Sequence, residues 1–353
     1  MRELVANVLR GCWYVVAIGD EIKTGRMIAR RLAGEPIVIA RGHDCGIFAL
    51  RDTCPHRGVP LHYGQVVDNT VACSYHGWRF KADGVCVEIP CLYEGQKIEI
   101  SKIRCRVYQA IERYGLIWVY LPVADESPAD GQMPEPPDLP GIAFGTAPQL
   151  HIQMDFPSSI DHSVLALMDL THAPYVHKLW WFKKDPTKLR LKEKVFEPAP
   201  FGFKMKRHKV PPQNVMYHRL LGDNTWTEIY YKLPGFRIEQ IKSDKNWAVA
   251  LTAHTPLEMD FTVVYQCFWS SLSWLAPFAP VARYLARTFL GQDRDYVVLQ
   301  REGLKSNPNI MLINDADTQA RWWLRLKDEW DNAQAARKPF HNPLREQTLR
   351  WRS

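Results

Sequence analysis

Four residues in the first third of the chain have the types and spacing of metal ligands. Cys54 and His56 form a C-x-H pair, and after sixteen intervening residues Cys73 and His76 form a C-x2-H pair. Two loops would therefore each offer one thiolate and one imidazole. An iron-sulfur cluster that carries two Cys on one iron and two His on the other needs this set of donors.

A structural zinc ion is the alternative, because zinc accepts the same two ligand types. Common zinc modules begin with a Cys pair and end with a His pair, whereas each loop here is mixed. Pro55, Gly58 and Gly77 lie beside the ligands. Such residues let the backbone approach a cluster closely, so that its N–H groups can hydrogen-bond the sulfurs. The spacing favours the cluster.

A second set begins at Asp169, where the sequence reads D-x2-H-x4-H and supplies His172 and His177. A mononuclear Fe(II) that binds O2 is held by two imidazoles and one carboxylate, with the opposite face open. On an ideal helix these two His would point about 140° apart. Pro174 lies between them and would kink or end the helix, which makes convergence feasible. Taken as an isolated pair, they would be better explained as structural histidines.

The elements that must position these residues fall into two regions. Residues 13–121 read as short β-type runs broken by turn residues, which predicts a small all-β unit. Residues 122–150 are rich in proline and predict an extended connector. Residues 151–353 combine a helix-like stretch around 158–172, alternating β-type runs over 235–269 and helix-like sequence from about 280. We therefore predict an α+β second domain.

Composition limits the class of protein. Of 353 residues, 46% are apolar and 24% charged, which fits a folded globular chain of two domains. The net charge of +7 is spread along the chain, so we expect no nucleic-acid partner. The charge-free segment 267–282 contains three Ser and two Pro and is too short for a membrane span, and no secretory signal is legible at the N-terminus. We expect a cytoplasmic protein whose eight Cys are reduced thiols or metal ligands.

Together, the two mixed Cys/His loops and the D-x2-H-x4-H segment resemble the Rieske non-haem iron oxygenases. The likeness is to the terminal oxygenase components, among them the vanillate O-demethylase group and the alpha subunits of ring-hydroxylating oxygenases. It implies an N-terminal antiparallel β Rieske domain at 1–121, a Pro-rich connector at 122–150 and a helix-grip (START-like) catalytic domain at 151–353. That catalytic domain should hold an antiparallel sheet and C-terminal helices.

Respiratory Rieske proteins differ from this sequence at three positions. They place an extra Cys in each loop, which form a disulfide, and a Ser after the second His-Gly. Val59, Ser74 and Trp78 stand at those positions here. Fewer hydrogen-bond donors to the cluster imply a lower reduction potential, which suits a ferredoxin-like electron donor.

The resemblance also implies the remaining site residues. In the O-demethylase branch the carboxylate ligand opens a helix, with a Gln seven residues and a Pro fifteen residues later. Asp293 fits this pattern with Gln300 and Pro308, and Asp295 is the alternate. Asp169 matches a carboxylate that, in a ring of three subunits, links a Rieske His, here His76, to an iron-ligand His, here His172.

The implied cofactors are a [2Fe-2S] cluster and a mononuclear Fe(II), with a homotrimer as the assembly. Electrons would come from NAD(P)H only indirectly, through a ferredoxin and/or a flavin reductase, because the chain has no GxGxxG motif. O2 would hydroxylate or demethylate an apolar aromatic, terpenoid or steroid-like molecule. Its pocket is expected near these residues: Leu165, Trp180, Trp181, Phe182 and the strand at 254–269. Two rivals stay open, an electron-transfer protein without oxygenase activity and a zinc-structured module.

Overall fold

The computed structural model describes residues 8–44, 46–123, 135–178, 185, 187–210 and 215–353. This part of the chain forms two compact units: residues 10–136 with 143–147, and residues 8–9, 137–142 and 148–353. Within the predicted connector at 122–150, residues 124–134 lie outside the described part of the chain. The boundaries given to the connector therefore stay a prediction.

The N-terminal unit contains three small antiparallel sheets. The first has the order β1 (Cys12–Ile18), β11 (Leu116–Leu121), β10 (Ala110–Arg113). The second has the order β2 (Arg26–Leu32), β3 (Glu35–Arg41), β4 (Ile47–Arg51), β9 (Val107–Tyr108). The third has the order β5 (Gln65–Val67), β6 (Thr70–Ala72), β7 (Arg79–Lys81), β8 (Cys86–Glu88). Single 3-10 turns lie at Gly19–Glu21, Leu61–Tyr63 and Ile100–Lys102.

The strands of this unit follow from their apolar runs. Every residue of β1 and β11 is buried, as expected for continuous β-type apolar segments covered on both faces. A second core lies next to the third sheet and includes Cys54, Leu61, Cys73 and Phe80. The predicted all-β N-terminal unit is therefore confirmed, and both Cys candidates belong to its core.

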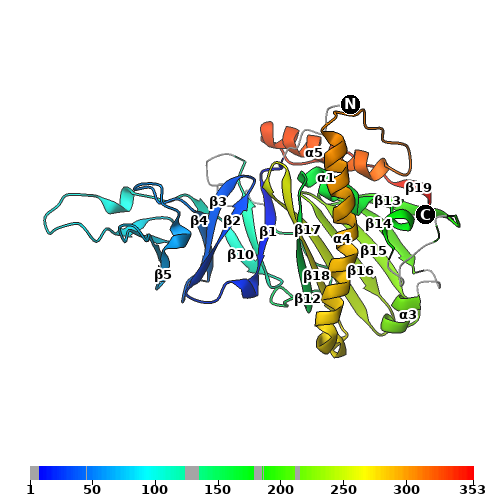
Figure 1. The fold of residues 1–353 in the computed structure, drawn as a ribbon, viewed down its shortest axis with the longest axis horizontal. Coiled ribbons are helices and arrows are strands. Elements are labelled where there is room, and N and C mark those ends of the chain that lie inside the picture. Colours follow the sequence, from blue (N-terminus) through cyan, green and yellow to red (C-terminus); the bar gives the residue numbers. More distant parts are fainter. Residues whose placement is uncertain (1–7, 45, 124–134, 179–184, 186, 211–214) are drawn as a thin grey trace. The chain divides into compact units, whose positions relative to one another are not determined.

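The second unit is built on one antiparallel sheet of eight strands. Their order is β12 (Leu150–Phe156), β18 (Phe261–Ser270), β17 (Trp247–Glu258), β16 (Phe236–Lys242), β15 (Trp226–Lys232), β14 (Gly202–Lys209), β13 (Leu191–Ala199), β19 (Gln347–Arg352). The helices are α1 (Ile160–Met168), α2 (Ala173–Val176), α3 (Val215–Leu221), α4 (Ala279–Leu304) and α5 (Thr318–Ala335), with a 3-10 segment at Ser273–Phe278. The predicted α+β class is confirmed (Figure 1).

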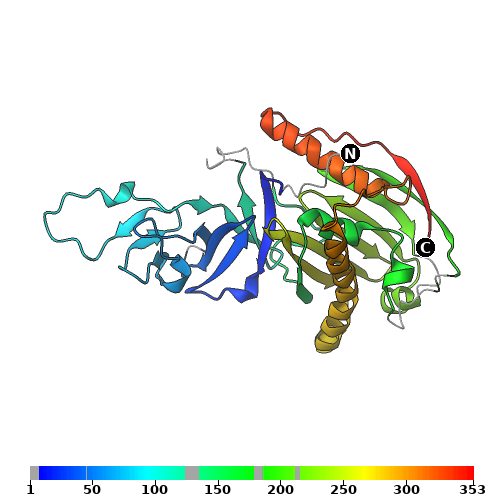
Figure 2. The same cartoon turned by 45° about the horizontal axis from the view of Figure 1, so that its top comes forward.

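Two long helices cover one face of this sheet, which we call the inner face (Figures 1 and 2). Directly paired residues point to the same face, and one such row crosses six strands. The row consists of Phe203, Tyr231, Arg237, Thr252, Gln266 and Ile152. At one end Phe203 contacts Trp322 of α5, with ring centroids 5.2 Å apart. At the other end Ile152 packs with Leu290 and Val297 of α4.

The helix-like stretch predicted around 158–172 contains only α1, and α2 begins after it at Ala173. Ser159 caps α1, accepting a hydrogen bond from the His162 backbone N–H. α1 ends at Met168 because Asp169 turns to an extended conformation with ψ 133°. The chain resumes helical geometry only for the single turn of α2. In contrast, the helix predicted from about residue 280 begins at Ala279. Among the described residues, no helix is both long and apolar enough to cross a membrane.

A buried ion pair fastens α1 to α5. Asp161 and Lys327 have side chains only 2% and 7% exposed, and both Asp161 oxygens lie 2.6 Å from Lys327 Nζ. Trp323 Nε1 donates a further hydrogen bond to Asp161 Oδ1 at 3.1 Å. α1 leads directly into the D-x2-H-x4-H segment. The ion pair therefore fixes the position of the helix from which this segment starts.

Replacing one partner of this pair should destabilise the second unit strongly. Lys327→Met would leave the Asp161 carboxylate buried without its cation, at a cost of about 3–5 kcal/mol. The exposed pair of Glu193 and Arg350 is the control, and Arg350→Met should cost less than about 1 kcal/mol. Denaturant unfolding followed by the helical signal measures both. Equal losses would contradict the structural role of the buried pair.

Candidate metal centres

The two mixed loops of the N-terminal unit have the same backbone design. In the first, Cys54 N–H donates to Val59 O at 2.9 Å and Gly58 N–H donates to Cys54 O at 2.9 Å. In the second, Cys73 N–H donates to Trp78 O at 2.9 Å and Gly77 N–H to Cys73 O at 3.0 Å. Each loop turns through a glycine with positive φ, 76° and 71°. A side chain is strained in that conformation, which explains a Gly at both positions.

The two cysteines of these loops meet in the core. Cys54 and Cys73 are only 2% and 5% exposed. Burial is the main reason why the pKa of Cys54 rises to about 11, and the hydrogen-bonded Cys73 thiol raises it further. If both adjacent thiols lost their protons, the two negative charges would repel each other unless a cation lay between them. This is the setting of a pair of metal-binding thiolates.

The two histidines meet at the edge of the same loops. The rings of His56 and His76 are 4.6 Å apart, and both are only partly buried. The Trp78 ring stacks on His56 at 4.4 Å and 5°, and Tyr75 contacts His76 at 3.8 Å. Trp78, one of the positions that departs from the respiratory pattern, thus supports a histidine ring.

The four residues therefore form a buried sulfur pair and a more exposed nitrogen pair. Ligands of one tetrahedral zinc ion would lie within about 4 Å of one another. Among the described residues, a set of three or more potential ligand atoms within 4.8 Å occurs at a single place, which does not include these four. The arrangement fits two metal atoms held by one pair each, as in a cluster with two Cys and two His ligands.

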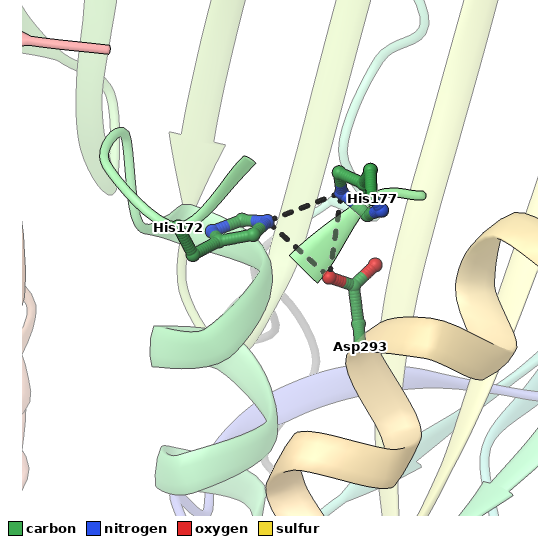
Figure 3. Close-up of side chains that lie close together, drawn as sticks. All are labelled: His172, His177 and Asp293. Atoms are coloured by element: carbon green, nitrogen blue, oxygen red, sulfur yellow. Dashed lines mark hydrogen bonds and ion pairs between the residues drawn. The ribbon is translucent and has the colours of Figure 1, made fainter. Parts of the chain in front are cut away.

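That single place is formed by His172, His177 and Asp293 (Figure 3). His172 Nε2 lies 3.3 Å from His177 Nε2 and 3.3 Å from Asp293 Oδ1. His177 Nε2 lies 3.6 Å from the same carboxylate oxygen. Two imidazoles and one carboxylate aimed at a common point are the donor set of a facial triad for Fe(II).

The local structure explains why the two histidines converge. His172 immediately precedes the single turn of α2 and His177 immediately follows it. They converge because they flank a one-turn helix that has Pro174 in its first turn. They do not converge through a kink in a longer helix. Pro suits that position because the first turn needs no backbone N–H bond.

Asp293 and its alternate Asp295 lie in very different surroundings. Asp293 is 5% exposed, whereas the Asp295 side chain is 72% exposed and 3.6 Å from Arg294. Asp293 also does not open a helix, because α4 begins at Ala279, fourteen residues earlier. That part of the sequence-based expectation is wrong. A helix seated on the sheet along its length presents a mid-helix residue to the interior.

Asp169 lies beside this triad without joining it. Its Oδ2 is 3.6 Å from His172 Nδ1, and its Oδ1 accepts hydrogen bonds from Thr171 N at 2.6 Å and Oγ1 at 2.8 Å. Burial by itself would favour the neutral forms of Asp169 and His172, but their polar contacts outweigh this effect. The pKa of Asp169 falls below its usual value, and the carboxylates of Asp169 and Asp293 raise the pKa of His172 to about 9. Asp169 is therefore a carboxylate with a lowered pKa that lies at ion-pair distance from a histidine of the triad.

Two residues at this site were missed by sequence reasoning. Gln292 Oε1 lies 3.2 Å from His177 Nδ1, and the Phe289 ring stacks on His177 at 3.9 Å and 16°. Both precede Asp293 on α4 by one residue and four residues, respectively. Spacing from Asp293 would have placed Phe289 on the same helix face, but no local motif marks either residue.

The expected pocket residues are only partly placed. Leu165 lines a cavity of about 180 Å³ together with Met168, Asp169 and Gln300. Trp180, Trp181 and Phe182 lie outside the described residues. His254 points to the inner face, where its Nδ1 is 2.8 Å from Ser163 Oγ, and burial lowers its pKa to about 3. His254 is thus a neutral histidine of the core.

Comparison with known proteins agrees with the first of these two centres. Residues 12–107 match the family described as "Rieske [2Fe-2S] domain". The chain is 34% identical over 176 residues to the vanillate O-demethylase oxygenase subunit of Pseudomonas sp. (strain HR199 / DSM 7063), covering 48% of this chain and 45% of that one. It is 31% identical over 171 residues to the chloroplastic chlorophyllide a oxygenase of Arabidopsis thaliana, covering 48% and 29%.

These alignments span less than half of each relative's length. The fold match is broader: the crystal structure of dicamba monooxygenase bound to dicamba covers 93% of this chain and 98% of its own, with a TM-score of 0.72 at 22% identity. At that identity the match speaks for the fold alone. The comparisons therefore show a Rieske [2Fe-2S] domain at residues 12–107 and, over most of the chain, the fold of dicamba monooxygenase.

Proposed function

We propose that this chain is the terminal oxygenase of a multi-component system that hydroxylates or oxidatively demethylates a small molecule with O2. The observation that carries the proposal is the convergence of His172, His177 and Asp293 in a chain that also has a Rieske domain. An electron carrier needs no second metal site. Cys54, His56, Cys73 and His76 would hold the cluster, and the triad would hold iron.

The cluster residues would store electrons, and the triad would be the place where O2 reacts with the substrate. Iron at the triad would supply O2 activation, since three protein ligands leave a face open. The buried Asp293 carboxylate offsets the metal charge, and Asp169 holds the His172 ring through Nδ1. Water exclusion comes from the inner face, where α4 packs on the sheet through Leu290 and Val297.

Asp169 is also the proposed link for electrons between subunits. Its side chain is 33% exposed, so one side of the carboxylate contacts His172 while another remains accessible. A docked His76 from a second copy would complete that link in a homotrimer. This assembly is part of the proposal, as are a ferredoxin and/or flavin reductase as electron source and a cytoplasmic location. Among the seven described cysteines, the five outside the proposed cluster ligands are not joined by disulfides, which supports a reducing compartment.

The inner face suggests the character of the substrate. The row described above includes the apolar or aromatic residues Phe203, Tyr231 and Ile152, which suit an aromatic, terpenoid or steroid-like molecule. Arg237, however, lies at the centre of the row described above, with Nη2 2.7 Å from Glu239 Oε2 and a quarter of its side chain exposed. We therefore propose an apolar substrate that carries a polar group.

Metal content separates this proposal from its two rivals. A red-brown protein with about three irons per chain, two in the cluster and one at the triad, is expected for the oxygenase. Two irons would favour an electron-transfer protein, and zinc alone a structural module. A substrate screen by O2 consumption with a surrogate reductase then tests the activity itself.

Cys73→Ala should abolish the visible spectrum of the cluster, because a methyl group cannot replace a thiolate ligand. Cys267→Ala is the control, since Cys267 is equally buried but lies in the second unit. Absorption spectra of the purified variants give the answer. An unchanged spectrum in Cys73→Ala would remove this residue from the ligand set.

His172→Ala, His177→Ala and Asp293→Ala should each keep the cluster spectrum but lose the mononuclear iron and O2-dependent turnover. Asp295→Ala is the matched control, because Asp295 is an exposed carboxylate on the same helix. Iron analysis of all four variants makes the measurement. The choice of carboxylate is wrong if Asp295→Ala loses iron while Asp293→Ala retains it.

Asp169→Asn should bind both metals and still accept electrons into the cluster, yet turn over poorly. The amide lacks the charge that orients His172 and would hold a docked His76, and losses of this kind typically reach ~10- to 100-fold. Single-turnover reoxidation of the reduced cluster, with substrate and O2, measures the transfer. Asp295→Asn serves as the control.

The bridging role also requires an oligomer, which native sizing of the parent protein tests. A fully active monomer contradicts it. So does an Asp169→Asn variant that reoxidises its cluster at the parental rate.

A further inference from the structure

α4 contacts His177 through three side chains that share one helical face. Phe289, Gln292 and Asp293 have i, i+3, i+4 spacing, so they lie next to one another along the helix. Asp293 approaches His177 Nε2, Gln292 approaches Nδ1, and Phe289 covers a face of the ring. One rigid element thus surrounds a histidine that belongs to another segment of the chain.

The geometry specifies which nitrogen of His177 carries a proton. Nε2 points toward His172 Nε2 and Asp293 Oδ1, so it is the nitrogen available to a metal. A neutral imidazole that binds a metal through Nε2 must carry its proton on Nδ1. Nδ1 then needs an acceptor, and Gln292 Oε1 lies 3.2 Å away. If the Gln292 amide nitrogen lay there instead, two hydrogen-bond donors, this nitrogen and His177 Nδ1–H, would face each other.

The two histidines of the triad are supported by different chemistry. His172 Nδ1 faces the Asp169 carboxylate, whereas His177 Nδ1 faces a neutral amide. With Fe(II) bound, the two negative charges of the Asp169 and Asp293 carboxylates would balance the two positive charges of the metal. A second supporting carboxylate would make the site negative, so a glutamine orients His177 without adding charge.

We propose that Gln292 is a positioning residue for the mononuclear metal: it fixes the Nδ1–H tautomer and the ring rotation of His177, while the stacked Phe289 fixes the ring plane. The inference rests on the proposed function only in that the triad must bind a divalent metal. It assigns to Gln292 an effect on metal affinity and coordination, with no direct contact to the metal.

The test measures metal binding in the full-length protein with its cluster in place. Fe(II) release to a colorimetric chelator and Co(II) titration followed by its ligand-field absorption are both read for Gln292→Leu, Gln292→Glu and the parent. Gln109→Leu is the matched control, since Gln109 is an exposed glutamine of the N-terminal unit. Thermal unfolding followed by the helical signal verifies that every variant is folded.

Gln292→Leu keeps the bulk but removes the acceptor, so its affinity for both metals should fall ~10- to 100-fold and its Co(II) spectrum should change. Gln292→Glu keeps an acceptor oxygen and should bind at least as tightly as the parent. Gln109→Leu should match the parent. Parental binding by Gln292→Leu overturns the inference, and so does an equal loss in Gln292→Glu, which would indicate packing alone.

Failure of the proposed function gives a different result. If the triad binds no metal, the parent and His172→Ala will be indistinguishable in both titrations. If the parent binds metal and His172→Ala does not, the centre exists and the Gln292 variants decide the inference.

Discussion

The structure depends on keeping one carboxylate buried beside two imidazoles. Asp293 is 5% exposed, and a carboxylate in such surroundings is costly unless it is paired. Its partners, His172 and His177, lie more than a hundred residues earlier in the chain. The site therefore exists only while α4 stays seated on the sheet. Packing of Leu290 and Val297 against Ile152 provides that seat.

The segment that carries the histidines is fixed from both sides. Upstream, the buried pair of Asp161 and Lys327 ties α1 to α5. Downstream, Gln292 and Phe289 hold the ring of His177 from α4. Between them lies the single helical turn of α2. Short metal-binding segments gain precision when rigid neighbouring elements lock their rotamers, and this site follows that rule.

The two mixed Cys/His loops are shaped mainly by their own backbone. Each closes on itself through two hydrogen bonds and one left-handed glycine, so both present a Cys inward and a His outward. Sequence spacing accounts for this well, because all the determinants of a loop lie within six residues. The sulfur pair is buried, whereas the nitrogen pair is partly exposed.

The sequence by itself determined the local features: the mixed Cys/His loops, the D-x2-H-x4-H segment, the β character of the first unit and the α+β class. Each depends on neighbouring residues or on a short periodicity, which are visible without a fold. The sequence alone did not determine the choice between Asp293 and Asp295, because this choice depends on the rotation of α4 about its axis. Residues two apart on a helix point about 200° from each other, so only one can face the sheet.

The same reason hid Gln292, whose partner His177 is 115 residues away. It also produced the wrong expectation that the ligand carboxylate opens a helix. Where a helix begins depends on local capping, but which of its residues face the interior depends on the surface it packs against. Contacts between segments far apart in the chain were decided by the tertiary structure alone, because packing, and no local pattern, sets their register.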